Sequence, residues 1–275
     1  MPAEVAATAR TLILVGCGRM GSALLRGWLA GAVASHILVV EPDGPPSGFA
    51  GMPNLSWHRS ADELPDGVAP LAVIFAVKPQ IIDDVLIGYR RWSQPRTVFI
   101  SIVAGKTIAG IVDRLGPAPV VRTMPNTPAA IGRGITVACA NGRVSREQRS
   151  LCDQLLAAVG ESAWVEDEAM LDAVTAVSGS GPAYVFLLIE ALTQAAQRLG
   201  LPSDLALQLA RSTVAGSGEL ARVSSESPAQ LRENVTSPGG TTRAALDVLM
   251  AGDGLIPLIT RAVDAAAARS RELAR

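Results

Sequence analysis

A glycine-rich hexapeptide near the start of the sequence has the residue types and spacing of a dinucleotide-binding turn. It reads Gly16-Cys17-Gly18-Arg19-Met20-Gly21, follows an apolar stretch and precedes a helical one. Its three glycines remove side chains that would hold the backbone away from a pyrophosphate, and the helix that follows offers N–H groups and a partial positive charge. Glu41 lies about 20 residues further on, where a carboxylate accepts hydrogen bonds from a ribose 2′-hydroxyl. The pattern predicts NAD(H) or NADP(H) binding; the alternative is a plain strand-to-helix turn.

Glu41 also bears on which dinucleotide binds. A carboxylate accepts from a 2′-hydroxyl but repels a 2′-phosphate, so Glu41 favours NADH. Arg59 opposes this interpretation, because its positive charge can reach over the ribose. The sequence therefore leaves NADH and NADPH both open, with a lean toward NADH.

Three further loops follow apolar stretches and carry residues suited to contacting a ligand. They are AVKPQ, SIVAG and RTMPNTP. In a doubly wound sheet, ligands bind at the carboxyl ends of the strands, so these loops are expected at the cofactor. The residues predicted to contact it are Ala76, Val77, Lys78, Pro79, Ala104 and Asn126. Two alternatives stay open: Lys78 is a solvated lysine at a helix start, or Asn126 caps its own turn.

Apolar stretches alternate with helical ones up to about residue 166, after which only helical segments follow. Such alternation implies parallel β-α-β units and a sheet covered on both faces. The expected strands are Thr11–Val15, His36–Val40, Leu71–Val77, Thr97–Val103, Pro119–Arg122, Gly134–Ala140 and Ser162–Val165. The helices expected in the second part are Met170–Val177, Ala183–Leu199, Ser203–Val223, Thr241–Met250 and Leu255–Leu273. We therefore predict an α/β domain over residues 1–166 and an all-α domain over residues 167–275.

Two runs of small residues interrupt the helical part, SGSGPAY at 178–184 and SPGGTT at 237–242. Glycine and proline disfavour helix interiors, so each run marks a break between helices. Small residues also let a ligand or a second backbone approach closely; the alternative for SGSGPAY is a simple interhelical loop. Residues 207–220 carry few charges, and a helix apolar nearly all round needs burial on several sides, part of it from another subunit.

Composition excludes several classes of function. Lys and Arg number 24 against 25 Asp and Glu, and aromatic residues make up 4% of the chain, which leaves no basic or stacking surface for nucleic acid. No run of 18 apolar residues predicts a membrane span, and MPAEVAATARTL does not resemble a signal peptide, so a cytoplasmic location is expected. Three scattered cysteines and two histidines give neither a disulfide framework nor a metal site.

Five strings, taken together and in order, resemble the pyrroline-5-carboxylate reductase family across essentially the whole chain. They are GCGRMG, AVKPQ, RTMPNTP, SGSGPAY and VTSPGGTT. The resemblance implies an N-terminal Rossmann-like dinucleotide-binding domain and an all-helical C-terminal dimerisation domain. It further implies NAD(P)H-dependent reduction of Δ1-pyrroline-5-carboxylate to L-proline, the final step of proline biosynthesis. Family members form homodimers with interleaved helices, and often decamers built from them.

The same resemblance assigns roles to the second small-residue run. Ser237, Gly240 and Thr241 hold the substrate carboxylate, because a helix N-terminus preceded by glycines is a ready anion site. Thr242 matches the family threonine whose hydroxyl approaches the imine nitrogen, either as proton donor or only to orient the ring of an already protonated substrate. Glu226 matches an acid near the substrate that acts through water.

One departure and two rival functions accompany this interpretation. Many family members carry an Asn that contacts the cofactor ribose where this chain reads WHRSADEL, so Arg59 or Ser60 substitutes for it. A β-hydroxyacid dehydrogenase shares the architecture but needs a catalytic lysine in its helical part, and no lysine follows Lys106. A dinucleotide-sensing or scaffold protein without turnover is opposed by the intact SPGG loop and Thr242.

Overall fold

The computed structural model describes residues 10–49 and 51–273 of the chain. An eight-stranded sheet is ordered β3-β2-β1-β4-β5-β6-β7-β8. The strands are β1 (Thr11–Val15), β2 (His36–Val40), β3 (Leu55–His58), β4 (Ala72–Phe75), β5 (Val98–Ser101), β6 (Val120–Met124), β7 (Gly134–Ala140) and β8 (Gly160–Trp164). The first six run parallel in the Rossmann order, so the predicted α/β class is confirmed.

The sheet is mixed rather than wholly parallel, because β7 pairs antiparallel to β6 while β8 pairs parallel to β7. A parallel crossover needs a dozen or more residues and usually a helix. The segment between β6 and β7 holds only the short 3-10 helix η3 (Thr127–Ile131). The chain therefore turns back beside β6, and the expectation of purely parallel units was wrong at this point.

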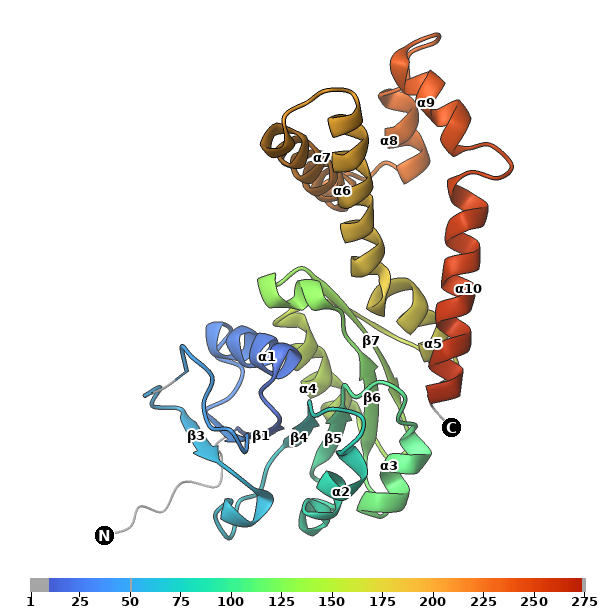
Figure 1. The fold of residues 1–275 in the computed structure, drawn as a ribbon. Coiled ribbons are helices and arrows are strands. Elements are labelled where there is room, and N and C mark those ends of the chain that lie inside the picture. The colour runs from blue at the N-terminus through green and yellow to red at the C-terminus, as the bar shows by residue number, and fades with distance from the viewer. Residues whose placement is uncertain (1–9, 50, 274–275) are drawn as a thin grey trace. The chain divides into compact units, whose positions relative to one another are not determined.

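Helices cover both faces of the sheet (Figure 1). On one face lie α1 (Arg19–Ala30) and α4 (Arg146–Ala157), and on the other lie α2 (Ile82–Ile87) and α3 (Ile108–Leu115). Alternate residues of each strand feed the two cores, as the two-residue side-chain period of a strand requires. Leu12 and Leu14 pack toward Trp28, whereas Ile13 and Val15 pack toward Tyr89.

Among the elements that were not predicted are β3, a short α-helix and a π-helix. β3 was missed because LSWH shows no apolar run, and all its residues are half-buried at the sheet edge. Helix α8 (Pro228–Asn234) was missed because PAQLREN lacks an apolar face; Ser227 caps it by accepting from the N–H of Gln230. After α5 (Met170–Val174), the residues Thr175–Gly179 form a π-helix that leads into α6, whereas a helix was expected only as far as Val177, with a break from residue 178.

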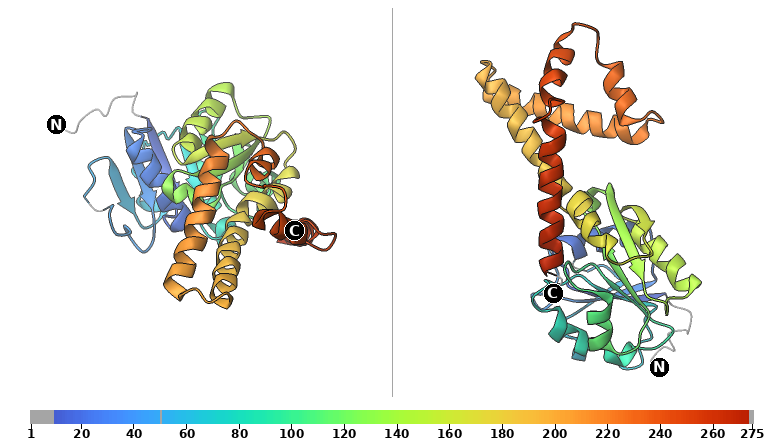
Figure 2. Two further views of the ribbon diagram at one scale, coloured as in Figure 1. Left: turned by 90° about the horizontal axis from the view of Figure 1, so that it is seen from above. Right: turned by 90° about the vertical axis from the view of Figure 1, so that its right-hand side faces the viewer.

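The chain forms two compact units. The first extends to Gly179 and includes the end of α10 from Ala267 onward, and the second is Ser180–Ala266. The second unit holds α6 (Gly181–Arg198), α7 (Ser203–Val223), α8, α9 (Thr241–Leu249) and most of α10 (Leu255–Leu273). Within it, α6 packs beside α7. Figure 2 shows α10 in red. Near its end, Ser270 Oγ donates to Asp172 Oδ1 of α5 at 2.6 Å.

The helices of the second unit leave many large apolar side chains exposed. No residue of α6, α8 or α9 is buried, and α7 buries only Ala206 and Ala210. The exposed apolar residues of α6, α7, α9 and α10 include Val185, Phe186, Leu187, Leu188, Leu192, Leu205, Leu207, Leu209, Leu220, Val248, Leu249, Ile256, Leu258 and Ile259. So large an apolar surface on a folded unit marks an interface.

One helical stretch, Met170–Arg198, passes the length and composition test for a membrane span. This is weak evidence, since helices of soluble proteins pass the same test. The prediction that no signal peptide is present concerns residues 1–9, which lie outside the described residues.

A partly buried ion pair links the segment before α5 to the sheet. Arg122 of β6, whose side chain is 7% exposed, donates from Nη1 to Glu168 Oε1 at 2.8 Å. The same oxygen accepts from the N–H of Ile108 at 2.8 Å, at the first residue of α3. One carboxylate thus joins β6, α3 and the segment leading to α5.

Loss of this carboxylate is expected to destabilise the first unit. Glu168→Ala leaves the buried guanidinium of Arg122 unpaired and lowers the free energy of unfolding of the first unit by about 3 kcal/mol. Glu168→Gln keeps an acceptor for Arg122 and is expected to lower that free energy less. Denaturant titration followed by tryptophan fluorescence measures this, because all four tryptophans lie in the first unit. Glu166→Ala is the matched control, since that side chain is 90% exposed. Equal midpoints for Glu168→Ala and the control contradict the prediction.

Candidate functional site

The hexapeptide Gly16–Gly21 forms the turn between β1 and α1, at the point where the strand order reverses between β1 and β4. Gly16 has φ +91, and a Cβ there would lie 2.7 Å from the carbonyl oxygen of Ala76. A Cβ on Gly21 would strike the carbonyl oxygen of Gly16. Both glycines are therefore required by close backbone packing. Gly18 differs, because its Cβ would meet no atom within 4 Å.

The open space at Gly18 fits a dinucleotide cradle. Gly18 is the N-cap of α1 and no side chain caps that helix, so its first N–H groups lack an intrahelical partner. The missing Cβ of Gly18 leaves room for a ligand to reach those donors. The turn thus has the shape, the donors and the helix polarity that a pyrophosphate needs.

Glu41 follows β2 and reaches into this turn. Its Oε2 accepts from the N–H of Cys17 at 2.7 Å, so the carboxylate is held directly beside the glycine loop. The Cys17 side chain points into the core, where Ser22 Oγ donates to the Cys17 carbonyl at 2.8 Å. Burial raises the pKa of the Cys17 thiol, so it stays protonated near neutral pH. Cys17 therefore contributes backbone to the site and offers no reactive thiolate.

The other predicted cofactor residues follow neighbouring strands. Ala76, Val77, Lys78 and Pro79 come after β4, with Lys78 exposed, and Ala104 comes after β5 and is exposed. The register aligns Val15, Val40, Phe75 and Ser101, so these loops leave one edge of the sheet together. Asn126 follows β6, and its Oδ1 accepts from the N–H of Ile135 at 2.9 Å. Its carbonyl group therefore fixes the turn into β7.

The second predicted cluster lies in the helical unit, between α8 and α9. Residues 237–240 form a turn in which the Gly240 N–H donates to the Ser237 carbonyl at 3.1 Å, and Gly239 has φ +71. Proline followed by a left-handed glycine is the signature of a type II turn. A Cβ on Gly240 would strike Ser237 Oγ, so this hydroxyl lies over the helix start. Helix α9 begins at Thr241 with Gly240 as its N-cap.

These residues present donors in one place. The N–H groups of Thr241 and Thr242 belong to the first turn of α9, which has no side-chain cap. Thr242 is half-buried, whereas Ser237 and Thr241 are exposed. The arrangement provides hydroxyl groups and free helix N–H groups, which suit a carboxylate.

Glu226 belongs to the same unit but reaches the cluster through a residue that the sequence did not single out. Asn234, at the end of α8, donates from Nδ2 to both carboxylate oxygens of Glu226, at 3.1 and 3.2 Å. Asn234 stands three residues before Ser237, in the string ENVTSPGG. That adjacency was the only signal in the sequence that could have identified it.

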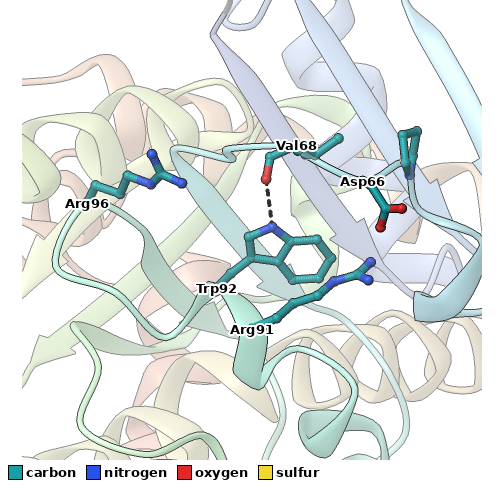
Figure 3. A pocket seen from close by; sticks show the side chains of 7 residues that line it. Asp66, Val68, Arg91, Trp92 and Arg96 are labelled. Atoms are coloured by element: carbon teal, nitrogen blue, oxygen red, sulfur yellow. Dashed lines mark hydrogen bonds between the residues drawn. The ribbon is translucent and has the colours of Figure 1, made fainter.

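One cavity, of about 230 Å³, borders the second cluster and is lined by residues of α8 and α9 that include Arg232, Thr236 and Arg243. Other cavities lie away from both clusters. Figure 3 shows one of about 170 Å³, lined by Asp66, Arg91, Trp92 and Arg96, in which Trp92 donates from Nε1 to the carbonyl of Val68 at 2.8 Å. These residues precede β4 and β5 and so lie at the amino ends of those strands. In the described part of the chain, no group of three His, Cys, Asp or Glu side chains could hold a metal ion.

Comparison with known proteins identifies the family to which the chain belongs. Residues 168–273 match the model of the pyrroline-5-carboxylate reductase dimerisation region. The chain is 39% identical over 269 residues to the pyrroline-5-carboxylate reductase of Pseudomonas aeruginosa, covering 96% of each sequence. The chain belongs to the pyrroline-5-carboxylate reductase family. The family resemblance found in the sequence motifs is thereby confirmed.

Solved structures of the pyrroline-5-carboxylate reductase family share the fold over nearly the whole chain. The structure from Coxiella burnetii has a TM-score of 0.86 at 32% identity, covering 98% of this chain and 99% of that one. The Plasmodium falciparum pyrroline carboxylate reductase, with NADP bound, has a TM-score of 0.81 at 29% identity, covering 96% and 98%. The Rossmann-like and helical parts together are therefore the fold of this family.

The glycine loop predicts two different outcomes for two similar substitutions. Gly18→Ala keeps the fold, because its Cβ meets nothing, but weakens NAD(P)H binding by about tenfold or more, since the methyl group blocks the exposed N–H groups. Gly16→Ala disturbs the fold as well, because its Cβ collides with Ala76. Calorimetric titration with NADH and NADPH, beside thermal unfolding without cofactor, separates the two. An unchanged affinity of the folded Gly18→Ala protein for NADH and NADPH contradicts the prediction that the cofactor binds at the start of α1.

Proposed function

We propose that this chain reduces Δ1-pyrroline-5-carboxylate to L-proline with NAD(P)H, the final step of proline biosynthesis. Membership of the pyrroline-5-carboxylate reductase family is the observation that carries this function. The substrate is a small cyclic imine with one carboxylate, so the protein must anchor an anion and leave the imine open to a hydride. NAD(P)H supplies that hydride, and the chain supplies binding, orientation and electrostatics.

We propose further that the two clusters divide this work. The loops after β1, β2, β4, β5 and β6 hold the cofactor, through the residues predicted from the sequence: Gly16, Cys17, Gly18, Arg19, Met20, Gly21, Glu41, Ala76, Val77, Lys78, Pro79, Ala104 and Asn126. The turn before α9 holds the substrate carboxylate through Ser237, Gly240 and Thr241. The Gly240 N–H already bonds Ser237, so the N–H groups of Thr241 and Thr242 are the freer donors.

Thr242 is proposed to contact the imine nitrogen. Its hydroxyl sits in the first turn of α9, one residue beyond the carboxylate anchor, so a ring held by its carboxylate is close to it. A threonine hydroxyl is a very weak acid, so two roles are open: proton donor, or orienting acceptor for a substrate that arrives protonated. Glu226 is proposed to act near the substrate through water.

The proposed assembly is a homodimer, with decamers built from such dimers as the larger form that the resemblance implies. The matched dimerisation region coincides with the helices whose apolar side chains are exposed. A second copy that covers this surface explains why α6 can be so apolar without crossing a membrane. We propose a cytoplasmic protein that binds neither membranes nor nucleic acid. Residues 1–166 form the proposed cofactor domain and residues 167–275 the proposed substrate and dimerisation domain.

We propose NADH as the preferred cofactor. Glu41 lies against the N–H of Cys17, so its negative charge is fixed beside the loop at the end of β2. A 2′-phosphate placed there is repelled, whereas a 2′-hydroxyl donates to the carboxylate. Arg59 opposes this preference, because it follows β3, the strand next to β2, and its positive charge would favour a 2′-phosphate.

The paired cofactor assay tests function and preference together. Loss of reduced-nicotinamide absorbance on adding pyrroline-5-carboxylate is expected with NADH and, less efficiently, with NADPH. Glu41→Ser raises the NADPH-to-NADH ratio of kcat/KM by about tenfold, because the repulsion is removed. Asp66→Asn is the control, because Asp66 precedes β4 and lies at the amino ends of the strands, away from the glycine loop. No turnover with either cofactor contradicts the function, while an unchanged ratio contradicts only the role of Glu41.

Substitution of Thr242 distinguishes its two roles. Thr242→Ala is expected to lower kcat by about 100-fold or more if the hydroxyl donates the proton, and by about tenfold if it only orients the ring. Thr242→Ser keeps the hydroxyl and retains most activity. The measurement is kcat against pH for both variants. An unchanged kcat for Thr242→Ala at every pH removes the donor role.

A further inference from the structure

Three polar side chains on and just before α8 are hydrogen-bonded in series, next to the proposed substrate turn. Gln230 donates from Nε2 to Asn234 Oδ1 at 2.8 Å. Asn234 donates from Nδ2 to Glu226 Oε1 and Oε2 at 3.1 and 3.2 Å. The three residues thus form one connected network that starts on α8 and ends on the carboxylate before it.

The backbone around this network is also held at both ends. Ser224 Oγ accepts from the N–H of Glu226 at 3.1 Å, which fixes the chain that leads into α8. At the other end, Thr236 Oγ1 donates to the carbonyl of Arg232 at 2.6 Å, and the N–H of Thr236 donates to the carbonyl of Glu233 at 2.9 Å. Ser237 follows directly. The position of Glu226 is therefore tied, through α8, to the turn that begins at Ser237.

We propose that Asn234 is a positioning residue that fixes the Glu226 carboxylate at the substrate turn. This inference rests on the proposed function, in which Glu226 acts near the substrate. Glu226 is exposed and has several rotatable bonds, so without a partner its carboxylate would sample many positions. The Asn234 amide, placed between both oxygens, holds the carboxylate in one orientation and leaves its remaining lone pairs for water and substrate.

Gln230 supports the orientation of the Asn234 amide that the carboxylate of Glu226, which can only accept, requires. An asparagine amide has a donor end and an acceptor end. Because the Gln230 Nε2 group donates to Asn234 Oδ1, the Asn234 amino group is the end directed at Glu226. Gln230→Glu replaces this donor with an acceptor, so the amide is expected to turn over and direct its oxygen at Glu226. Gln230→Glu therefore removes the hydrogen bond from Asn234 to Glu226, as Asn234→Ala does, but leaves Asn234 itself unchanged.

The test is a double-mutant cycle with steady-state kinetics. Glu226→Ala, Asn234→Ala and the double variant are compared with the unaltered chain, by kcat/KM for pyrroline-5-carboxylate and KM for the cofactor. Asn234→Ala is expected to lower kcat/KM by about tenfold, the effect of one hydrogen bond to a charged group, with cofactor KM unchanged. The double variant is expected to be no worse than Glu226→Ala alone, because Asn234 acts only through Glu226.

Two further variants separate positioning from a merely structural role. Asn234→Asp places a second carboxylate against Glu226, so its kcat/KM is expected to fall below that of Asn234→Ala. Gln230→Glu is expected to match Asn234→Ala. A structural role would instead lower the melting temperature and change the cofactor KM in all variants. Glu233→Gln, on the same helix with an ion pair of 3.9 Å, is the control and is expected to leave kinetics unchanged.

Each outcome bears on one claim. Additive losses in the double variant overturn the proposal, and so does an unchanged kcat/KM for Asn234→Ala. If Glu226→Ala has no effect while Asn234→Ala does, Asn234 acts elsewhere and the proposal falls. Absence of turnover by the unaltered chain contradicts the proposed function itself, and is seen before any variant is compared.

Discussion

Close approach of bare backbone is the constraint on which both clusters depend. At the turn after β1, a Cβ on Gly16 would lie 2.7 Å from the carbonyl oxygen of Ala76, so no side chain fits where the strand order reverses between β1 and β4. At the turn before α9, Gly240 leaves room for the Ser237 hydroxyl in the same way. At the first turn it is Gly18, two residues after Gly16, that leaves the uncapped N–H groups of α1 accessible to a ligand, and α9 likewise begins without a side-chain cap. Both ligands of the proposed reaction carry negative charge, and an uncapped helix start is suited to binding each of them.

The two units differ in how far they bury their apolar side chains. The sheet unit buries its strands between two helix layers, and its cysteines are buried with pKa values raised by that burial, Cys152 to about 12. The helical unit has almost no buried side chain of its own. Its stability therefore depends on a surface that another copy covers, which agrees with the dimerisation region matched over residues 168–273. Association is in this sense part of the fold.

Polar side chains with several partners supply order where apolar packing is thin. Glu168 joins β6, the start of α3 and the segment before α5 through one carboxylate oxygen. Asn234 joins Glu226 to the helix that precedes the substrate turn. Neither residue stands in a sequence pattern that marks it, because the partners lie 46 residues from Glu168 and 8 residues from Asn234. Such bonds are consequences of the fold, and they hold the motifs in place.

The sequence by itself determined the α/β class, five of the six parallel strands, and the turns at Gly16–Gly21 and at 237–240, because these depend on local signals. Apolar runs mark strands, and glycine or proline marks a backbone conformation that other residues disfavour. The tertiary structure decided what local signals do not carry. It paired β7 antiparallel to β6, and it formed β3 at the sheet edge and α8 without an apolar face. It directed the side-chain oxygen Oδ1 of Asn126 at the N–H of Ile135. It also placed Glu41 on the Cys17 N–H and Asn234 on Glu226, since hydrogen bonds between residues far apart in the chain exist only once the backbone has brought them together.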